Sequence, residues 1–175
     1  VQLSKRVRPV PTGYHTVTPY LIVQGAAAAI DFYRQAFNAK ELSRSVAADG
    51  HTIVHASLKI GNSVVFLADE IPGMSSLSPI SLMGSSVVLH LYVPSVDKLW
   101  DQALEAGGQE LLPLQDAFWG DRYGQIMDPF GHRWTLASRK ENLTEEEIEQ
   151  RAAALYAPVE ATSEASPLDS EPVSL

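Results

Sequence analysis

The sequence contains no cysteine among its 175 residues. Disulfide bridges, thiolate metal sites and thiol nucleophiles are therefore excluded. No apolar stretch is long enough to cross a membrane as a helix. The basic N-terminal region also lacks the apolar core of a secretory signal. These absences predict a cytoplasmic protein with no membrane partner.

The chain has little charge imbalance outside its C-terminal end, although its net charge is −8. Residues 141–175 contain nine of the 21 acidic residues and one of the 13 basic residues. Residues 1–140 therefore contain twelve acidic and twelve basic residues, and their net charge is zero. Nucleic-acid binding needs a basic patch or stripe, so we expect no nucleic-acid partner. Residues 158–175, rich in Ser, Glu and Pro, are expected to form a disordered acidic tail.

One pattern occurs twice in the chain, at a spacing of 70 residues. Residues 19–23 (PYLIV) precede the helix-like segment 26–37, and residues 89–93 (LHLYV) precede the helix-like segment 96–106. An internal duplication of this kind indicates two similar structural units that bury their apolar faces together. The question of function therefore becomes what lies between the two copies.

Each copy is predicted to form one strand, one helix and three further strands, from apolar periodicity and turn signals. The expected strands are residues 16–23, 41–47, 52–60 and 63–69 in the first copy, and 86–93, 110–114, 118–127 and 132–137 in the second. The fold class is thus α+β, with two βαβββ modules. The expected boundaries are a leader 1–12, modules 13–70 and 86–138, a linker 71–85 and a C-terminal helix within 139–157. Ser95 is expected to cap the second helix, and a capping box to begin the last one at Thr144.

Two motifs near the end of the second copy resemble a known superfamily. Residues 128–134 read Asp-Pro-Phe-Gly-His-Arg-Trp, and residues 119–124 read Trp-Gly-Asp-Arg-Tyr-Gly. Together with the two βαβββ units, they resemble the glyoxalase and bleomycin resistance proteins of the vicinal oxygen chelate superfamily. Residues 14–21 and 118–120 are similar to its PhnB-like branch. The resemblance covers residues 13–138, and it implies a curved mixed sheet around a cleft and a homodimer.

The resemblance also implies four metal-ligand positions, two from each copy. Carried over residue by residue, these positions are Thr18, Val65, Val88 and Thr135. The 70-residue spacing relates the first of them to the third and the second to the fourth. Valine has no lone pair to offer, and a threonine hydroxyl is a poor ligand for Zn, Fe, Ni or Mn. We therefore expect no metal ion and no other cofactor.

Side-chain alternation along the strands predicts a set of polar residues inside the cleft. The set consists of Tyr20, His55, His90, Tyr92 and Gln125. The repeat places His55 opposite Gln125, and it places His90 opposite Tyr20. Three interpretations stay open: a structural hydrogen-bonded network, a pocket for a small organic ligand, or a displaced metal site at the two histidines.

Trp119 and Arg122 form a second candidate feature. An arginine beside an aromatic ring can clamp an anionic or planar ligand by charge and stacking. The alternative is a surface arginine paired with Asp121 or Asp128, and a tryptophan that fills the edge of the sheet. Both interpretations are compatible with the sequence.

The leading hypothesis is a metal-independent protein that binds a small organic molecule and forms a homodimer. The polar set, Trp119 and Arg122 would line its pocket. One alternative is a glyoxalase-like lyase or isomerase, or a dioxygenase, with a rearranged active site. In that case His55 or His90 would act as general base, because histidine titrates near neutral pH. The other alternative is an interaction module that recruits a partner through its acidic tail.

Overall fold

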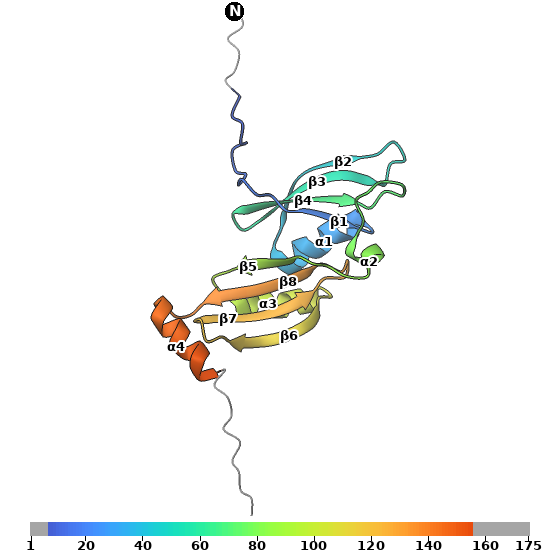
Figure 1. The fold of residues 1–175 in the computed structure, drawn as a ribbon. Coiled ribbons are helices and arrows are strands. Elements are labelled where there is room, and N and C mark those ends of the chain that lie inside the picture. Colours follow the sequence, from blue (N-terminus) through green and yellow to red (C-terminus); the bar gives the residue numbers. More distant parts are fainter. Residues whose placement is uncertain (1–6, 156–175) are drawn as a thin grey trace, which may run out of the picture.

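The computed structural model describes residues 7–155, and two similar modules follow one another along this part of the chain (Figure 1). The first module contains β1 (Tyr20–Val23), α1 (Ala26–Phe37), β2 (Lys40–Val46), β3 (Ile53–Ile60) and β4 (Ser63–Asp69). The second contains β5 (Val88–Tyr92), α3 (Val96–Glu105), β6 (Gln109–Asp116), β7 (Asp121–Met127) and β8 (Arg133–Arg139). The linker holds a short helix, α2 (Pro79–Leu82), and the second module is followed by α4 (Glu145–Leu155).

Each module forms a four-stranded mixed sheet with the same topology. The strand orders are β1-β4-β3-β2 and β5-β8-β7-β6. The first strand of each module runs parallel to its last strand, and the other neighbours are antiparallel. This arrangement confirms the α+β class and the two βαβββ modules predicted from the repeat.

The structure differs from the sequence-based expectation in several element boundaries. The first strand begins at Tyr20 rather than at residue 16, and β7 begins at Asp121 because Phe118 to Gly120 form a turn. Gly120 adopts a φ of 92°, which lies in the left-handed region that favours glycine. The helix α2 was not expected at all. Its only sequence signal is Ser78 before Pro79, and the Ser78 side chain accepts a hydrogen bond from the Ser81 N–H.

The two main helices are capped from the end of the last strand of their own module. The Asp69 carboxylate accepts hydrogen bonds from the N–H groups of Gly25 and Ala26 at the start of α1. The Ser138 hydroxyl accepts a hydrogen bond from the Val96 N–H at the start of α3. Ser95 occupies the N-cap position of α3 as expected, but its side chain makes no capping hydrogen bond among the described residues. A residue distant in sequence satisfies the free N–H group instead.

The buried Asp128 side chain joins the two modules. Its Oδ2 accepts hydrogen bonds from the Tyr33 hydroxyl of α1 at 2.6 Å and from the Trp134 indole of β8 at 2.9 Å. Its Oδ1 accepts hydrogen bonds from the N–H groups of Phe130 and His132 in its own turn. The Asp-Pro-Phe-Gly motif is therefore the junction where the second module holds the first.

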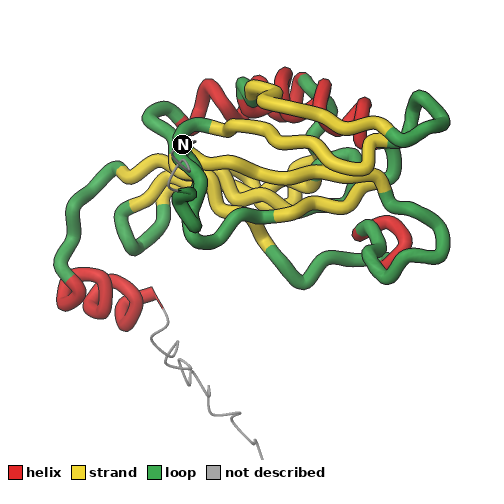
Figure 2. The backbone as a smooth tube through the Cα atoms, turned by 90° about the horizontal axis from the view of Figure 1, so that it is seen from above, coloured by secondary structure: helices red, strands yellow, loops and turns green. Residues whose placement is uncertain are grey.

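The last helix stands apart from both sheets (Figure 2). Its predicted capping box is present: the Glu147 carboxylate accepts from the Thr144 N–H, and the Thr144 hydroxyl accepts from the Glu147 N–H. None of its residues is buried. Within residues 7–155, no helix combines the length and the apolar character needed to cross a membrane. The predicted tail 158–175 and the first half of the leader lie outside the described residues.

Candidate functional site

Each sheet packs one face against the helices and leaves its other face open. In the first sheet the open face carries Tyr20, His55, Ser57 and Phe66. The His55 ring lies 4.8 Å from the Phe66 ring and meets the Tyr20 ring edge-on at 5.6 Å. Its Nδ1 lies 3.2 Å from the Tyr20 hydroxyl, and its Nε2 lies 3.3 Å from the Ser57 hydroxyl. Both ring nitrogens of His55 therefore have a hydroxyl partner, and aromatic rings enclose them.

The segment of residues 9–18, which joins the end of the leader to β1, forms a wall over this open face. The Tyr14 ring contacts the Phe66 ring at 5.8 Å between centroids. A cavity of about 540 Å³ lies between the leader and the sheet, and its lining includes His15, Thr18, His55 and Ser57. This volume falls within the range of small-molecule pockets. Tyr20 and His55, two members of the polar set predicted from the sequence, are thus brought together beside a cavity.

The second sheet carries a polar cluster on its own open face. The His90 and Tyr92 rings lie 4.5 Å apart. The Tyr92 hydroxyl donates to Asp121 Oδ2 at 2.6 Å, and the Trp119 indole donates to the same oxygen at 3.1 Å. The hydrogen bond to Asp121 raises the pKa of Tyr92, because it stabilises the neutral phenol. Asp121 is buried, and its Oδ1 has no hydrogen-bond partner among residues 7–155 but lies 3.6 Å from the Arg139 guanidinium.

Gln125 lies one strand further across the same face. Its amide donates to the Thr135 hydroxyl at 3.3 Å and accepts from the Arg133 guanidinium at 2.6 Å. The Arg133 Nε is buried without a hydrogen-bond partner among the described residues. A buried donor without a partner is uncommon, and it gives this face an unused hydrogen-bonding atom.

The strand register corrects the correspondence between the two copies. Tyr20 pairs with Phe66 in the first sheet, and His90 pairs with Thr135 in the second. Phe66, and not Val65, is therefore the counterpart of Thr135. Val65 points into the hydrophobic core on the opposite face of its strand.

The same register changes which residue of the second module corresponds to His55. Ser57 pairs with Phe66, as Gln125 pairs with Thr135, so Ser57 is the counterpart of Gln125. His55 corresponds to Tyr123, two residues earlier in β7. The spacing of 70 residues holds for the first strand and the helix of each module. It falls to 68 at β3 and β7 and to 69 at β4 and β8, because the connections differ in length.

The residues at the metal positions do not fit a divalent metal ion. After the correction, the four positions hold Thr18, Phe66, Val88 and Thr135, and none offers a carboxylate or imidazole. Within the part of the chain that the structure describes, no three histidine, cysteine or carboxylate side chains are grouped so that they could hold a metal. His55 and His90 lie on the open faces of two different sheets.

Arg122 lies away from the open face. Its guanidinium forms ion pairs with Asp97 of α3 at 2.8 Å and with Asp116 of β6 at 3.3 Å. These partners differ from the two carboxylates considered in the sequence analysis. Alternation places Arg122 on the helix side of β7, next to Gly124, which contacts α3. The structure therefore separates Arg122 from Trp119, which lies with the open-face cluster.

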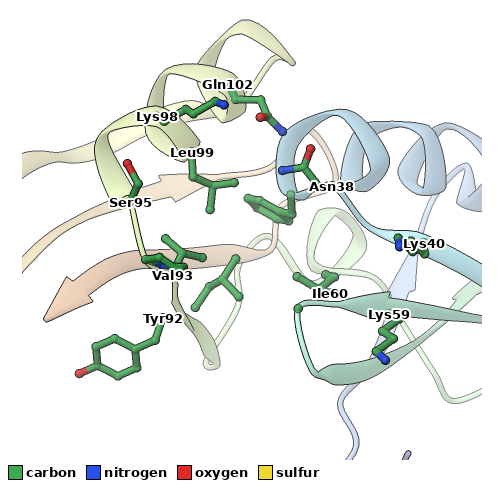
Figure 3. A pocket seen from close by; sticks show the side chains of 14 residues that line it. Asn38, Lys40, Lys59, Ile60, Tyr92, Val93, Ser95, Lys98, Leu99 and Gln102 are labelled. Carbon is green, nitrogen blue, oxygen red and sulfur yellow. The ribbon is translucent and has the colours of Figure 1, made fainter.

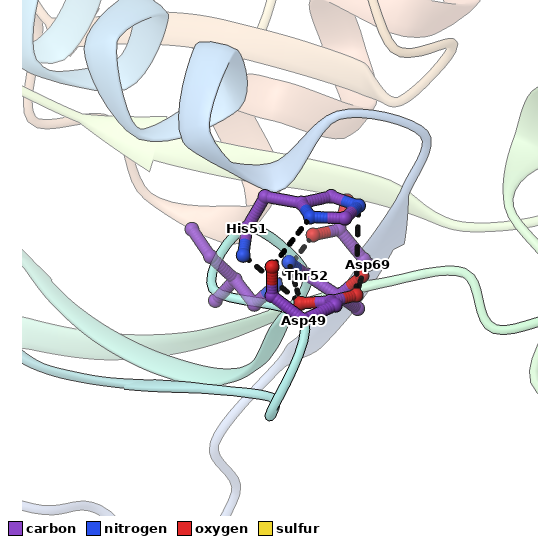
Figure 4. Close-up of polar contacts among 5 residues, drawn as sticks. Asp49, His51, Thr52 and Asp69 are labelled. Atoms are coloured by element: carbon purple, nitrogen blue, oxygen red, sulfur yellow. Dashed lines mark hydrogen bonds and ion pairs between the residues drawn. The ribbon is translucent and has the colours of Figure 1, made fainter.

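A third polar group surrounds the turn between β2 and β3 (Figure 4). The Asp49 carboxylate accepts hydrogen bonds from the N–H groups of His51 and Thr52. Asp69 accepts from the Ile53 N–H at 2.7 Å, in addition to capping α1. These carboxylates are occupied by backbone donors of the turn and the helix start, so their arrangement is structural.

Sequence reasoning missed Phe66, Asp121 and Arg133, which share the open faces with the predicted residues, whereas alternation along the strand had already placed Ser57 on the same face as His55. The available signal was strand alternation from Tyr20 and Gln125, but it needed the pairing register between strands. Asp121 was considered only as a partner for Arg122. Its position below Tyr92 and Trp119 depends on contacts between strands that are distant in sequence.

Comparisons with known proteins agree with this geometry. The family model for the Glyoxalase/Bleomycin resistance protein/Dioxygenase superfamily matches residues 13–136. The uncharacterized protein Rv0887c of Mycobacterium tuberculosis (strain ATCC 25618 / H37Rv) is 43% identical over 136 residues, which cover 76% of this chain and 79% of that protein. The chain is similar in structure to TioX from Micromonospora sp. ML1, with a TM-score of 0.57 and 26% identity over 71% of this chain and 98% of that one. It is also similar to FosX from Listeria monocytogenes in complex with Mn(II) and sulfate, with a TM-score of 0.55 and 17% identity over 79% of this chain and 97% of that one.

Proposed function

We propose that this chain, which belongs to the Glyoxalase/Bleomycin resistance protein/Dioxygenase superfamily, binds a small organic molecule on the open faces of its sheets without a metal ion. The observation that carries the proposal is the chemistry of these faces. At the four positions where metal-using relatives would place ligands, they offer one aromatic ring, one valine and two threonine hydroxyls. A pocket with apolar walls and a few convergent polar groups is what a small-molecule site requires.

The polar groups indicate which kind of ligand fits. Tyr20, His55 and Phe66 present ring edges and faces, which favour a planar or aromatic ligand through stacking. Arg133 and Gln125 supply a guanidinium and an amide that can meet carbonyl, hydroxyl or carboxylate oxygens. A planar ligand with oxygen substituents matches both sets.

In a homodimer, the open face of one sheet meets the open face of the other sheet from a second copy of the chain, and each such pair of faces forms one site. Tyr20 and Tyr92 are 49% and 58% exposed, and Val88 is 40% exposed, so both faces leave large apolar groups in solvent. Contacts between the modules are made by the packing of α1 against α3 and by Asp128 and His132, and none of these joins the open faces. We therefore place the first sheet of one copy opposite the second sheet of its partner in a homodimer.

Metal analysis and ligand screening test the absence of a metal and the presence of a ligand separately. Protein purified without chelator should contain far less than one equivalent of divalent metal, and one bound equivalent would contradict the proposal. A thermal-shift screen of planar oxygenated compounds should give ligands that raise the melting temperature, because binding to the native state stabilises it. Replacing His55 or Gln125 by Ala should abolish the shift, whereas replacing His51, an exposed histidine in a turn, should preserve it.

Mixing two defective variants tests the shared site. In the proposed dimer, each site combines His55 of one chain with Gln125 of the other. When a His55→Ala chain pairs with a Gln125→Ala chain, one of the two sites therefore contains only native residues. Ligand binding should therefore return when the two variants are unfolded together and refolded as a mixture. If each chain carried a complete site, the mixture would bind no better than either variant alone.

A second candidate function follows from the contacts of His55. Its two ring nitrogens lie 3.2 Å and 3.3 Å from hydroxyl groups, so the ring is oriented and could transfer a proton as a general base. An enzyme of the lyase or isomerase class would then lose turnover in the His55→Ala variant while it still bound substrate. Unchanged turnover of a candidate substrate in that variant would exclude this role.

A further inference from the structure

A second cavity lies where the two modules meet, away from the open-face cavity beside the leader. Its volume is about 600 Å³. One wall is formed by the end of α1 and the paired ends of β2 and β3, and the other by the end of β5 and the start of α3 (Figure 3). Both modules therefore contribute to this cavity within a single chain.

The polar part of the cavity lining is cationic. The lining includes Lys40, Lys59 and Lys98, which are three of the five lysines of the whole chain, and it includes no aspartate or glutamate. Figure 3 shows Lys98 on α3 and the other two lysines on the opposite wall. Among residues 7–155, no ion pair is formed by any of these three lysines. The cavity thus concentrates positive charge that the protein itself does not neutralise.

Two of these lysines are placed at an electrostatic cost. Lys40 of β2 is the direct cross-strand partner of Lys59 of β3. Like charges directly opposite one another destabilise a strand pair. An anion bound between the walls would relieve this repulsion. The start of α3 also faces the cavity, and the Ser95 side chain there makes no capping hydrogen bond. Helix N-termini favour negative charge.

The base of the cavity is apolar and is held in place before any ligand binds. Phe37, Ile60 and Leu99 line it and are each buried to more than 90%. The Gln102 amide of α3 donates to the carbonyl oxygen of Ala36 at 3.2 Å, which links the two helices at this point. A preformed apolar base costs little ordering free energy on binding.

We propose that this junction cavity binds an amphipathic organic anion, a carboxylate with an apolar body. The apolar body lies on the base formed by Phe37, Ile60 and Leu99. The carboxylate lies near the lysines on the walls. This cavity is distinct from the one beside the leader, because the two linings share no residue, although Tyr92 of the open-face cluster also lines it. A ligand in it would contact both modules and hold them together.

Decanoate serves as the probe, in calorimetry and in amide chemical-shift mapping of the full chain. We expect it to bind, to shift the amide signals of Asn38, Ser95 and Gln102, and to bind more weakly as salt increases. Decanamide, which has the same apolar chain and no charge, should bind at least about tenfold more weakly, which corresponds to about 1.4 kcal/mol. Failure of decanoate to bind at millimolar concentration would overturn the proposal.

The three cavity lysines and a lysine outside the cavity give the matched variants. Replacing Lys40, Lys59 and Lys98 together by Gln should weaken decanoate binding at least about tenfold, whereas Lys140→Gln should leave it unchanged. Lys59→Gln alone should not lower the melting temperature, because it removes a like-charge contact. Equal binding by the triple variant, or chemical shifts confined to His55, Gln125 and their neighbours, would overturn the junction site. The His55→Ala variant should bind decanoate as the native chain does, so the two proposals can fail independently.

Discussion

The substitution Asp128→Asn tests the junction between the modules. The native carboxylate accepts four hydrogen bonds, from the Tyr33 hydroxyl, the Trp134 indole and two backbone N–H groups. An asparagine amide has one oxygen, so its NH₂ group must face either the indole N–H or the two backbone N–H groups. At least one buried donor is left without an acceptor, which costs about 1–3 kcal/mol. The remaining hydrogen bonds also lose the strength that the charge gives them.

We therefore expect Asp128→Asn to lower the free energy of unfolding by about 2–4 kcal/mol, a large fraction of the total for a domain. Urea denaturation at neutral pH measures this change. Asp31→Asn is the control, since Asp31 lies on the exposed side of α1 and forms an ion pair with Arg34 at 3.3 Å. Its loss should stay within about 0.5 kcal/mol. A loss below about 1 kcal/mol for Asp128→Asn, or one equal to that of the control, would refute the reasoning.

Three further predictions concern other parts of the fold. Burial raises the pKa of Tyr33 well above 10.0, so the stability that depends on its neutral phenol is present below pH 10 and is lost as the pH rises further. Urea unfolding at pH 9 and pH 11 should show a smaller alkaline loss for Tyr33→Phe than for the native chain, and equal losses would contradict this. A Cβ at Gly124 would lie 2.5 Å from the Trp100 ring, so Gly124→Ala should cost about 1–3 kcal/mol in the same assay. Gly84→Ala, which meets no atom within 4 Å, should be nearly neutral, and similar effects of the two would exclude a clash. Hydrogen bonds from neighbouring serine residues lower the pKa of Glu70 to about 2, and an NMR titration midpoint near the ordinary 4.5 would disprove it.

The repeat was sufficient to predict the order of the elements within each module. Apolar periodicity placed α1 at its observed bounds, and Asn38 ends it with a φ of 54°, as a left-handed residue at a helix end should. Asp49 and Gly50, a dipeptide typical of hairpin turns, lie between β2 and β3. These features depend on neighbouring residues in the chain, so local sequence determines them.

The pairing register between strands could not be predicted from the repeat alone. The 70-residue spacing implied that Val65 corresponds to Thr135, but a loop that differs by one residue exchanges the two faces of a strand. Phe66 therefore occupies the open face and Val65 the core. The hydrogen bond at the start of α3 could not be predicted either, because the Val96 N–H donates to the distant Ser138 hydroxyl and not to the adjacent Ser95 side chain. A register and a cap of this kind are set by contacts between distant segments.

The sequence by itself determined the fold class, the duplication and the absence of metal-ligating side chains at the positions implied by the family. These properties depend on residue type and on local spacing. Tertiary structure alone decided which polar residues meet: His55 with Tyr20 and Ser57, Tyr92 with Asp121, and three lysines at the junction of the modules. It did so because side chains far apart in sequence are brought together by strand register and helix packing, and neither can be derived from the order of residues within one segment.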